Sequence, residues 1–383
     1  MLLFLFLLAC APCEKERVEP HTAIPCADLY DPERVTEYAV VIDPVEWDGL
    51  LEEYSNWEER RAAGLPVKPY HPLVSFRYGD EIVTDATIRL KGNPCCSWEV
   101  DKMQFVIAFN QLDPDGRFHG VRKLALDAAF YDPSALRERV GLSYFADAGI
   151  PAACANHATL TINGELYGTY TNLEFVDDEF IERQFPDEER GALYKLDFIT
   201  QNWEHQNGTG GLPQLRELYA IDDDLDAIVE AFDIDSALSF WGAEAAINRS
   251  DGYWAGSINF FLYKPVDRGW TLFPWDLDNA ISYWGPRRNP FRRKDYHGYA
   301  GHLDPILEDP EWRERFGDGV REAHTRLDPQ VLIDRIDRWD AQIRPLLAAE
   351  PNLPYTLEEH DEAVESLRNH LGVRDRYLCG LLR

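Results

Sequence analysis

The sequence predicts an α+β fold with two lobes, in which a strand-rich N-terminal lobe precedes a mainly helical C-terminal lobe. Strand-like segments dominate the first half of the chain, and an Asn163-Gly164 pair between two apolar-alternating runs is a strong hairpin signal. From about residue 233 onward the chain is mainly helical in character. The 383 residues, 45% of them hydrophobic, allow a substantial core in one large domain or two lobes.

The N-terminal lobe is expected to begin with a strand and a helix. Residues 38–43 (YAVVID) form an apolar run typical of a strand. Residues 44–63 start with Pro44 and place apolar side chains at helical spacing, which predicts an amphipathic helix. Further strands are predicted at 72–78, 82–90 and 103–109.

A second helix is predicted over residues 133–148, with Asp132 as its N-cap and Gly149 after its end. The runs 158–162 and 165–170 flank the Asn-Gly pair and are expected to form a hairpin. The remaining predictions are a helix near 177–185, a strand at 193–196, a polar Gly-rich loop at 199–215, and a strand pair at 260–263 and 270–273. No Lys-Ser or Lys-Thr follows the glycines of the polar loop, so it is not a phosphate loop of the Walker type.

The first ten residues, MLLFLFLLAC, resemble a signal peptide that ends in a lipoprotein cleavage box. We expect Cys10 to be the lipidated first residue of an exported protein, although a buried N-terminal strand or helix is the alternative. Residues 11–35 are predicted to be a spacer, followed by one domain over 36–383. Its N-terminal lobe is expected at about 36–198 and its C-terminal lobe at about 199–383.

The composition restricts the partners of the chain. With 38 basic and 68 acidic residues the net charge is -30, which repels nucleic acids and anionic membrane surfaces. No nucleic-acid partner is expected, and contact with the membrane of the cell envelope is expected only through the lipid at Cys10. The same field repels ATP, so a nucleotide site would need local cations and a divalent metal.

Cysteine usage is consistent with an oxidising compartment. Without Cys10, six cysteines remain, an even number. Their pairing cannot be deduced, and the adjacent Cys95 and Cys96 allow either one vicinal bridge or two separate ones. Among these six cysteines no C-x-x-C pair occurs, and the chain has no H-E-x-x-H motif, so no zinc site is indicated. The six residues are Cys13, Cys26, Cys95, Cys96, Cys154 and Cys379.

The densest chemical signal consists of two segments, 251–263 (DGYWAGSINFFLY) and 270–278 (WTLFPWDLD). Asp251 on a loop leads to Asn259 at the start of a strand, and the predicted hairpin returns to Asp276 and Asp278. Carboxylate and amide oxygens suit Mg²⁺, which prefers hard oxygen ligands together with waters and phosphate oxygens. Asp251, Asn259 and Asp276 follow the order of the proton-accepting Asp and the two metal ligands in kinases.

These segments resemble the D…N-[FY]-[FY]-L-Y…W…P-W-D-L-D signature of the CotH (spore coat protein H) kinase family. Upstream segments resemble the family in the same order, so that the likeness spans about residues 70–285. They are Arg89 to Asn93 (RLKGN), Lys102 to Phe105, Phe118 to Leu124, Leu136 to Glu138, Ala148 to Pro151, Ile162 to Gly164, Tyr167 to Tyr170, Glu174, and Tyr194 with Lys195.

The resemblance implies an atypical two-lobed protein-kinase-like fold and an ATP-dependent protein kinase that uses Mg²⁺ or Mn²⁺. It implies that Asp251 is the catalytic Asp and that Asn259, Asp276 and Asp278 bind metal. Lys102 is then the candidate for the phosphate-contacting lysine, with Glu138 as its helical partner. Arg89 and Glu174 are further candidates for nucleotide binding.

A cluster of five cations directly follows the second acidic segment, against the overall charge of the chain. We hypothesise that it binds a phosphorylated or acidic segment of a protein substrate, because arginine forks match phosphate oxygens. The alternative is a loop that neutralises nearby acidic surface. The cluster consists of Arg287, Arg288, Arg292, Arg293 and Lys294.

Two other functions remain open from the sequence. The chain could be a catalytically inactive kinase-like lipoprotein of the envelope that acts as a binding or structural protein. It could also be a metal-dependent hydrolase that uses Asp251, Asp276 and Asp278.

Overall fold

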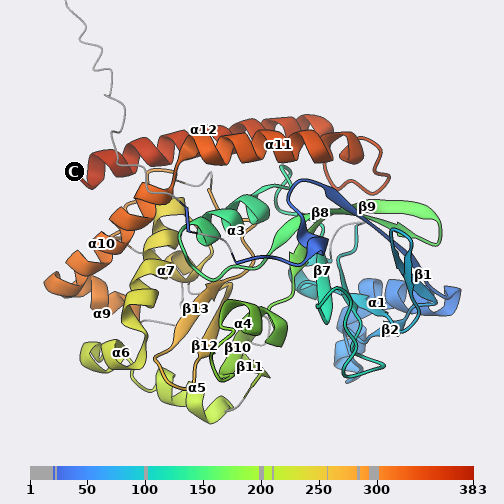
Figure 1. Ribbon diagram of the computed structural model, residues 1–383, viewed down its shortest axis with the longest axis horizontal. Helices are drawn as coiled ribbons and strands as arrows, with labels where there is room; N and C mark the ends of the chain where they lie inside the picture. The colour runs from blue at the N-terminus through green and yellow to red at the C-terminus, as the bar shows by residue number, and fades with distance from the viewer. Residues whose placement is uncertain are drawn as a thin grey trace, which may run out of the picture.

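The computed structural model describes residues 20–21, 24–98, 102–197, 202–208, 211–256, 258–282, 285–292 and 302–383. It confirms the α+β fold. A large sheet and helix α1 make up one half of the molecule, and a small sheet and most of the other helices make up the other half (Figure 1).

The first half contains a nine-stranded sheet with the strand order β2-β5-β6-β7-β9-β8-β1-β3-β4. Only β1 and β8 pair in parallel, and the other neighbours are antiparallel. The strands are β1 (Val35–Val41), β2 (His71–Pro72), β3 (Ser75–Tyr78), β4 (Glu81–Val83), β5 (Thr87–Leu90), β6 (Phe105–Ala108), β7 (Lys123–Asp127), β8 (Ala155–Ile162) and β9 (Glu165–Glu174).

The second half contains an antiparallel four-stranded sheet with the order β11-β10-β12-β13. Its strands are β10 (Ala192–Asp197), β11 (Asn202–Asn207), β12 (Phe260–Lys264) and β13 (Thr271–Pro274). The predicted division between the lobes, at 198/199, falls between β10 and β11, which belong to the same sheet.

Most of the helices surround this small sheet. In Figure 1, α11 and α12 lie side by side and extend from the helical half to the nine-stranded sheet. The helices are α1 (Pro44–Ala62), α2 (Pro94–Ser97), α3 (Arg137–Asp147), α4 (Asp178–Gln184), α5 (Leu212–Tyr219), α6 (Leu225–Ala231), α7 (Ile234–Ile247), α8 (Tyr253–Gly256), α9 (Leu303–Glu308), α10 (Pro310–Arg326), α11 (Pro329–Leu347) and α12 (Leu357–Leu381), with a 3-10 turn η1 (Asp28–Tyr30). None of the helices within the described ranges is both long enough and apolar enough to cross a membrane.

Two apolar cores match the two halves. One joins the nine-stranded sheet to α1 and η1, and includes Phe76, Phe105 and Leu160. The other joins the small sheet to the helices, and includes Trp241, Phe273 and Ile336. Helix α3 belongs to the second core through Val140 and Phe145, although it lies between strands of the first sheet in the sequence. It therefore connects the two halves.

The hairpin prediction is confirmed by β8 and β9. Asn163 and Gly164 both have positive φ angles, 51° and 92°, as a two-residue type I′ turn requires. The helix at 44–63 and the strand pair near 260–273 are confirmed as well, by α1 and by β12 with β13.

Two element predictions are corrected by the structure. The helix expected from residue 133 begins only at Arg137, because Ala135 adopts a left-handed φ of 52° that interrupts the helix. Asp132 still binds the start of α3, since its carboxylate accepts hydrogen bonds from the backbone N–H groups of Leu136 and Arg137. The segment 199–215, predicted as a loop, contains β11 and the start of α5.

Residues 24–34, within the predicted spacer, are packed onto the domain. Leu29 and Tyr30 are 0% and 2% exposed, and a disulfide joins Cys26 to Cys154 just before β8. Asn172 donates a hydrogen bond to the backbone carbonyl of Leu29. Residues 1–19, which include the predicted signal peptide and Cys10, lie outside the described residues.

A buried histidine joins α1 to the edge strand β2. His71 Nδ1 lies 2.8 Å from Glu46 and Nε2 lies 2.9 Å from Glu53, both on α1. Arg60 also approaches Glu53, at 3.8 Å. The hydrogen bond to Glu53 raises the pKa of His71, Glu46 adds to this effect, and burial partly opposes it.

We predict that replacing His71 with Gln lowers the free energy of unfolding by about 1–3 kcal/mol near pH 6, because buried Glu53 loses a charged partner. The folded-state pKa of His71 is raised, so its stabilisation is fully present below the pKa of the unfolded chain. It is lost as the pH rises through the folded-state pKa. Urea unfolding of both proteins at several pH values should therefore show a difference that shrinks from pH 6 to pH 9.

His119→Gln is the matched control. His119 also contacts two carboxylates, those of Asp28 and Glu81, but both are more than half exposed. Its replacement should change stability less. A His71→Gln effect that does not vary with pH would contradict the assignment of a charged His71.

Candidate active site

Five carboxylates gather where the two halves meet. They come from separate parts of the chain: Asp127 ends β7, Glu138 lies in the first turn of α3, Asp251 follows α7, and Asp276 and Asp278 follow β13. Burial raises the pKa of Glu138 to about 8, and the charges of Asp276 and Asp127 add to it. Burial and the same mutual repulsion raise the pKa values of Asp276 and Asp278. The group therefore favours the binding of a cation.

Helix α3 holds the segment that carries Asp276 and Asp278. The Glu138 carboxylate accepts a hydrogen bond from the backbone N–H of Leu277, between the two aspartates. Arg137 donates to the carbonyls of Ala280 and Ile281, at 3.0 and 2.6 Å. These contacts fix the acidic segment through its backbone and leave the side chains of Asp276 and Asp278 to face the site.

The closeness of α3 to this segment depends on a glycine. A Cβ atom at Gly141 would lie 3.2 Å from Leu277 and 3.3 Å from Ala280. A larger residue would require Leu277, Ala280 or the helix to shift by a few tenths of an ångström.

Arg249 organises the opposite side of the site. Its guanidinium pairs with Glu244 at 2.5 Å, and both side chains are completely buried. The same guanidinium donates to the carbonyls of Asn259, at 2.5 Å, and of Trp275. The ends of β12 and β13 are thereby held together, and with them Asn259 and Asp276, as the hairpin pattern predicted.

Asp251 is oriented by two amides. Asn259 and Asn279 each donate to its Oδ2 atom, at 3.1 Å. Its Oδ1 atom is buried and has no hydrogen-bond partner among the described residues. Burial raises the pKa of Asp251 to about 7, with a contribution from the charge of Asp276, while Arg249 opposes the shift. A carboxylate with a pKa near neutrality is suited to accept a proton.

Two lysines face this group of acids. Lys91, directly after β5, pairs with Asp127, and its ammonium lies 5.8 Å from the centre of the Trp275 ring. Burial lowers the pKa of Lys91, but Asp127, Asp276 and Glu138 outweigh this and the net pKa is raised. Lys195 on β10 lies 4.7 Å from the same ring, and its charge lowers the pKa of Asp276. The ammonium group of Lys91 is therefore charged, and both lysines lie beside the carboxylates.

The direct contacts of Lys102 lie outside the acidic group, although the charge of Asp127 acts to raise its pKa. Its side chain is buried and pairs with Glu350 at 2.7 Å, and it donates to the carbonyl of Thr169 at 2.5 Å. Burial lowers its pKa, and Glu350 opposes this. Lys102 thus fastens the turn between α11 and α12 onto β9, and the lysine that lies beside Glu138 is Lys91.

Arg89 and Glu174 also make contacts of their own. Arg89 donates to the carbonyl of Leu90 and stacks on Tyr70. Glu174 forms an ion pair with Arg183 and accepts a hydrogen bond from the backbone N–H of Cys154. None of these contacts is with one of the five carboxylates. Arg89 and Glu174 are therefore not members of the acidic group.

The basic cluster lies in the loop after the acidic segment. Arg287 and Arg292 are exposed, and Arg288 lies over the Trp254 ring. Arg374 of α12 anchors this loop by donating to the carbonyls of Pro286 and Arg288. The other two members, Arg293 and Lys294, lie outside the described residues.

The donor chemistry of the site fits magnesium. Carboxylate and amide oxygens are the ligands that Mg²⁺ prefers, and it needs only one or two carboxylates when waters and phosphate oxygens complete its shell. Across the described part of the chain, no group of three or more His, Cys, Asp or Glu side chains forms a ready-made metal cage. Asp276, Asp278 and Asn259 remain the predicted ligands.

Four residues of the site were missed from the sequence: Lys91, Asp127, Lys195 and Asn279. Lys91 and Lys195 lie within segments quoted for the family resemblance, but nothing in their spacing distinguishes them from Lys102. Asp127 carries only the weak signal of an acid at the end of an apolar strand. Asn279 follows the Trp-Asp-Leu-Asp segment directly, and a search for amides beside the acids would have found it.

Comparison with known proteins identifies the family of the chain. Over residues 88–378 the chain matches the family model described as CotH kinase protein. It is 23% identical over 294 residues to inner spore coat protein H of Bacillus subtilis (strain 168), which covers 68% of this chain and 78% of that protein. It is 42% identical over 55 residues to an inner spore coat protein H-like protein of the same organism, covering 14% of this chain and 18% of that relative. The family match spans both the acidic group and the helices around it, and the chain belongs to the CotH kinase family.

Proposed function

We propose that the protein is an ATP- and Mg²⁺-dependent kinase that transfers a phosphoryl group to a hydroxyl of a protein. The observation that supports this most directly is the group of five carboxylates with two lysines beside it. Structural ion pairs balance their charges, whereas here the pKa values of Glu138, Asp251 and Asp278 are raised by burial and by neighbouring acids. Such an imbalance is typical of a site that binds metal and phosphate.

Lys91 is the proposed phosphate-contacting lysine, in place of Lys102. Its ammonium is paired with Asp127 and lies near Glu138, which holds the acidic segment through Leu277. This is the lysine and helical glutamate arrangement expected of a kinase-like site, with a different lysine from the one the sequence indicated. Lys195 supplies a second positive charge on the opposite sheet.

Asp251 is the proposed proton acceptor. Its Oδ2 atom is held by the amides of Asn259 and Asn279, and the buried Oδ1, which has no hydrogen-bond partner among the described residues, would accept the hydroxyl proton once the acceptor displaces the groups that cover it. The acceptor oxygen bonds to phosphorus as the bond to the leaving nucleoside diphosphate breaks. Mg²⁺ bound by Asp276, Asp278 and Asn259 would neutralise phosphate charge there.

We also propose that the protein works outside the cytoplasm. One relative carries the name of a spore coat protein, and the Cys26–Cys154 disulfide favours an oxidising compartment. The predicted signal peptide and the lipid on Cys10 would hold the domain at a membrane of the cell envelope. Exported localisation and lipidation would be tested together by palmitate labelling of cells that carry Cys10→Ala.

Replacing Lys91 with Met, or Asp276 with Ala, should reduce nucleotide-dependent labelling of a protein substrate at least ~100-fold, because each removes charge stabilisation from the transferred group. Labelled ATP and Mg²⁺ with the purified domain provide the assay, and circular dichroism checks the fold. Lys264→Met, which removes a lysine at the end of β12 farthest from Asn259, is the control and should retain full activity.

The outcomes separate the candidate functions. Release of free phosphate without protein labelling would indicate a hydrolase. Absence of nucleotide binding would indicate a binding or structural protein. If Lys91→Met retains labelling, a cation other than Lys91 contacts the phosphate.

Replacing Glu138 with Gln should raise the free energy of unfolding by about 1 kcal/mol at pH 8 while labelling falls, since functional sites often cost stability. The amide oxygen can still accept the hydrogen bond from Leu277, and the repulsion from Asp276 and Asp127 is relieved. Glu174→Gln is a control for which the opposite change is expected. Glu174 pairs with Arg183, so removing its charge should lower the free energy of unfolding. A Glu138→Gln protein that is less stable and fully active would show a structural role.

The exposed arginines after the acidic segment are proposed to bind an acidic or phosphorylated segment of the substrate. Arg287→Ala together with Arg292→Ala should raise the KM for an acidic peptide several-fold and leave ATP turnover unchanged, because exposed charges act mainly on binding. The effect should shrink at high salt. An unchanged KM at low salt would contradict this role.

A further inference from the structure

The loop between β7 and α3, residues 128–136, connects two carboxylates of the active site. Asp127 precedes this loop, and Glu138 follows it in the first turn of α3. Within the loop, the Asp132 carboxylate accepts a hydrogen bond from the backbone N–H of Arg137 at 2.8 Å. The position of the loop, called the α3 loop below, therefore sets the start of α3.

Two histidines from distant parts of the chain approach backbone carbonyls of the α3 loop. Nε2 of His157, on β8, lies 2.8 Å from the carbonyl oxygen of Ala135. Nδ1 of His360, on α12, lies 2.9 Å from that of Pro133. Both histidines are completely buried. A carbonyl oxygen can only accept a hydrogen bond, so each of these two nitrogens carries a proton.

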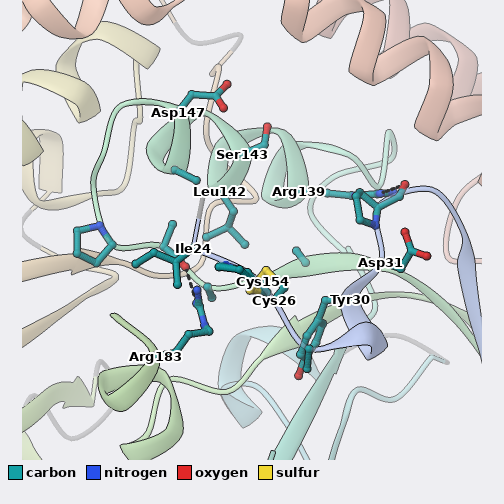
Figure 2. A pocket seen from close by; sticks show the side chains of 18 of the residues that line it. Ile24, Cys26, Tyr30, Asp31, Arg139, Leu142, Ser143, Asp147, Cys154 and Arg183 are labelled. Atoms are coloured by element: carbon teal, nitrogen blue, oxygen red, sulfur yellow. Dashed lines mark hydrogen bonds between the residues drawn. A yellow bond between two sulfur atoms is a disulfide. The ribbon is translucent and has the colours of Figure 1, made fainter. Parts of the chain in front are cut away.

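His157 makes its contacts as a neutral ring. Its Nδ1 atom accepts a hydrogen bond from Arg139 at 2.8 Å, and a guanidinium can only donate. Figure 2 shows Arg139 extending from α3 toward the chain segment of Asp31, where it also donates to the carbonyl of Pro32. Burial and the charge of Arg139 lower the pKa of His157 to about 3. The contact between His157 and Ala135 is therefore the same throughout the physiological pH range.

His360 needs two protons to make both of its contacts. Its Nε2 atom lies 2.8 Å from the Asp340 carboxylate of α11, while Nδ1 donates to Pro133. Both partners are acceptors, and a neutral imidazole has only one N–H group. Burial by itself lowers the pKa of His360, but the hydrogen bonds to Asp340 and Pro133 outweigh it, the charges of Asp340 and Asp361 add to them, and the net pKa is raised.

The other titratable groups around His360 do not replace Asp340 in this role. Tyr355 stacks on the His360 ring and stays protonated, because burial raises its pKa far above the physiological range. Asp361 pairs with Arg344. The groups concerned are Asp340 of α11, Asp361 and Arg368 of α12, Tyr355 between these helices, Asp132 of the α3 loop, whose charge acts on Tyr355, and His157 of β8.

We propose that His360 is a positioning residue that holds the α3 loop only in its doubly protonated form, so that the start of α3 responds to pH. A neutral ring can donate to Asp340 or to Pro133 but not to both. Hydrogen bonds to a carboxylate are the stronger ones, so Pro133 is released. Because the folded-state pKa is raised, the hold is complete below the pKa of the unfolded chain and is lost as the pH rises through the folded-state pKa.

Release of Pro133 would reach the active site through the first turn of α3. Asp132 of the loop binds Arg137, and Arg137 donates to the carbonyls of Ala280 and Ile281 in the acidic segment. A looser loop would therefore loosen the segment that carries the proposed metal ligands. This consequence rests on the proposed kinase activity, whereas the hold of His360 on the loop does not.

Hydrogen exchange of the complete protein at pH 6 and pH 9, without nucleotide, tests the hold. Protection factors are compared, since they remove the intrinsic pH dependence of exchange. Peptides that cover residues 131–137 should lose protection at least ~10-fold between pH 6 and pH 9, because a hydrogen bond from a charged donor is lost. Peptides from α10 should change less than ~2-fold.

Three variants separate the protonation of His360 from its mere presence. His360→Gln has one donor group for two acceptors, so its loop should be as weakly protected at pH 6 as that of the unchanged protein at pH 9. Asp340→Asn should keep high protection at both pH values, because its amide can donate to Nε2 of a neutral ring whose Nδ1 still donates to Pro133. His157→Gln is the matched control. It supplies one donor and one acceptor, as neutral His157 does, and should leave the pH dependence unchanged.

Nitrogen NMR with isotope-labelled histidine rings keeps the proposal testable if His360→Gln does not fold. The signals of His360 are those that change in Asp340→Asn. They should show two protonated nitrogens at pH 6 and one at pH 9. A single protonated nitrogen at pH 6 would overturn the proposal. So would a loop whose protection is the same at both pH values, or a pH dependence that persists in Asp340→Asn.

Labelling with ATP then tests the consequence for the active site. The ratio of the labelling rate at pH 9 to that at pH 6 should be more than ~2-fold higher in Asp340→Asn than in the unchanged protein, an effect of the size that coupling between sites commonly has. Equal ratios would contradict the coupling through α3. A protein with the proton-dependent hold that never labels a substrate would contradict the proposed kinase activity and not this role of His360.

Discussion

The buried ion pair between Arg249 and Glu244 is the interaction on which the candidate site depends. One guanidinium pairs with Glu244 and also holds the carbonyls of Asn259 and Trp275, so that two strand ends and α7 meet at one point. Glu244 in turn accepts the backbone N–H of Trp254 at 2.6 Å. Removing one partner of such a pair typically costs ~3–5 kcal/mol, because the other charge stays buried. The backbone positions of Asn259 and Asp276 follow from this arrangement.

Helix α3 complements that pair from the other half of the molecule. Three consecutive charged residues at its start are buried, and they contact different parts of the fold. Arg137 and Glu138 hold the acidic segment, whereas Arg139 holds the N-terminal segment at Pro32. Burying three charges in one turn is expensive unless each is hydrogen-bonded. The helix therefore links the N-terminal segment, the nine-stranded sheet and the acidic group into one structure.

The five carboxylates of the acidic group repel one another. Carboxylates that raise one another's pKa destabilise a fold unless a cation or a proton compensates. Lys91 and Lys195 compensate only in part, since the pKa values of Asp251 and Glu138 remain near 7 and 8. In the exposed pair of Arg344 and Asp361, by contrast, the arginine lowers the pKa of the aspartate.

The sequence by itself determined the fold class, the Asn163-Gly164 hairpin and the presence of Asp251, Asn259 and Asp276 in one region, because these depend on local periodicity and on order along the chain. Only the tertiary structure decided which lysine lies beside Glu138. Lys91 and Lys102 are close in sequence, yet Lys91 directly follows β5 and pairs with Asp127, whereas Lys102 is buried against Glu350, far along the chain. The choice depends on contacts between distant segments, which no local pattern records. The same holds for Asp127, whose ion-pair partner Lys91 follows β5 and whose like-charged neighbours Glu138 and Asp276 lie on α3 and after β13.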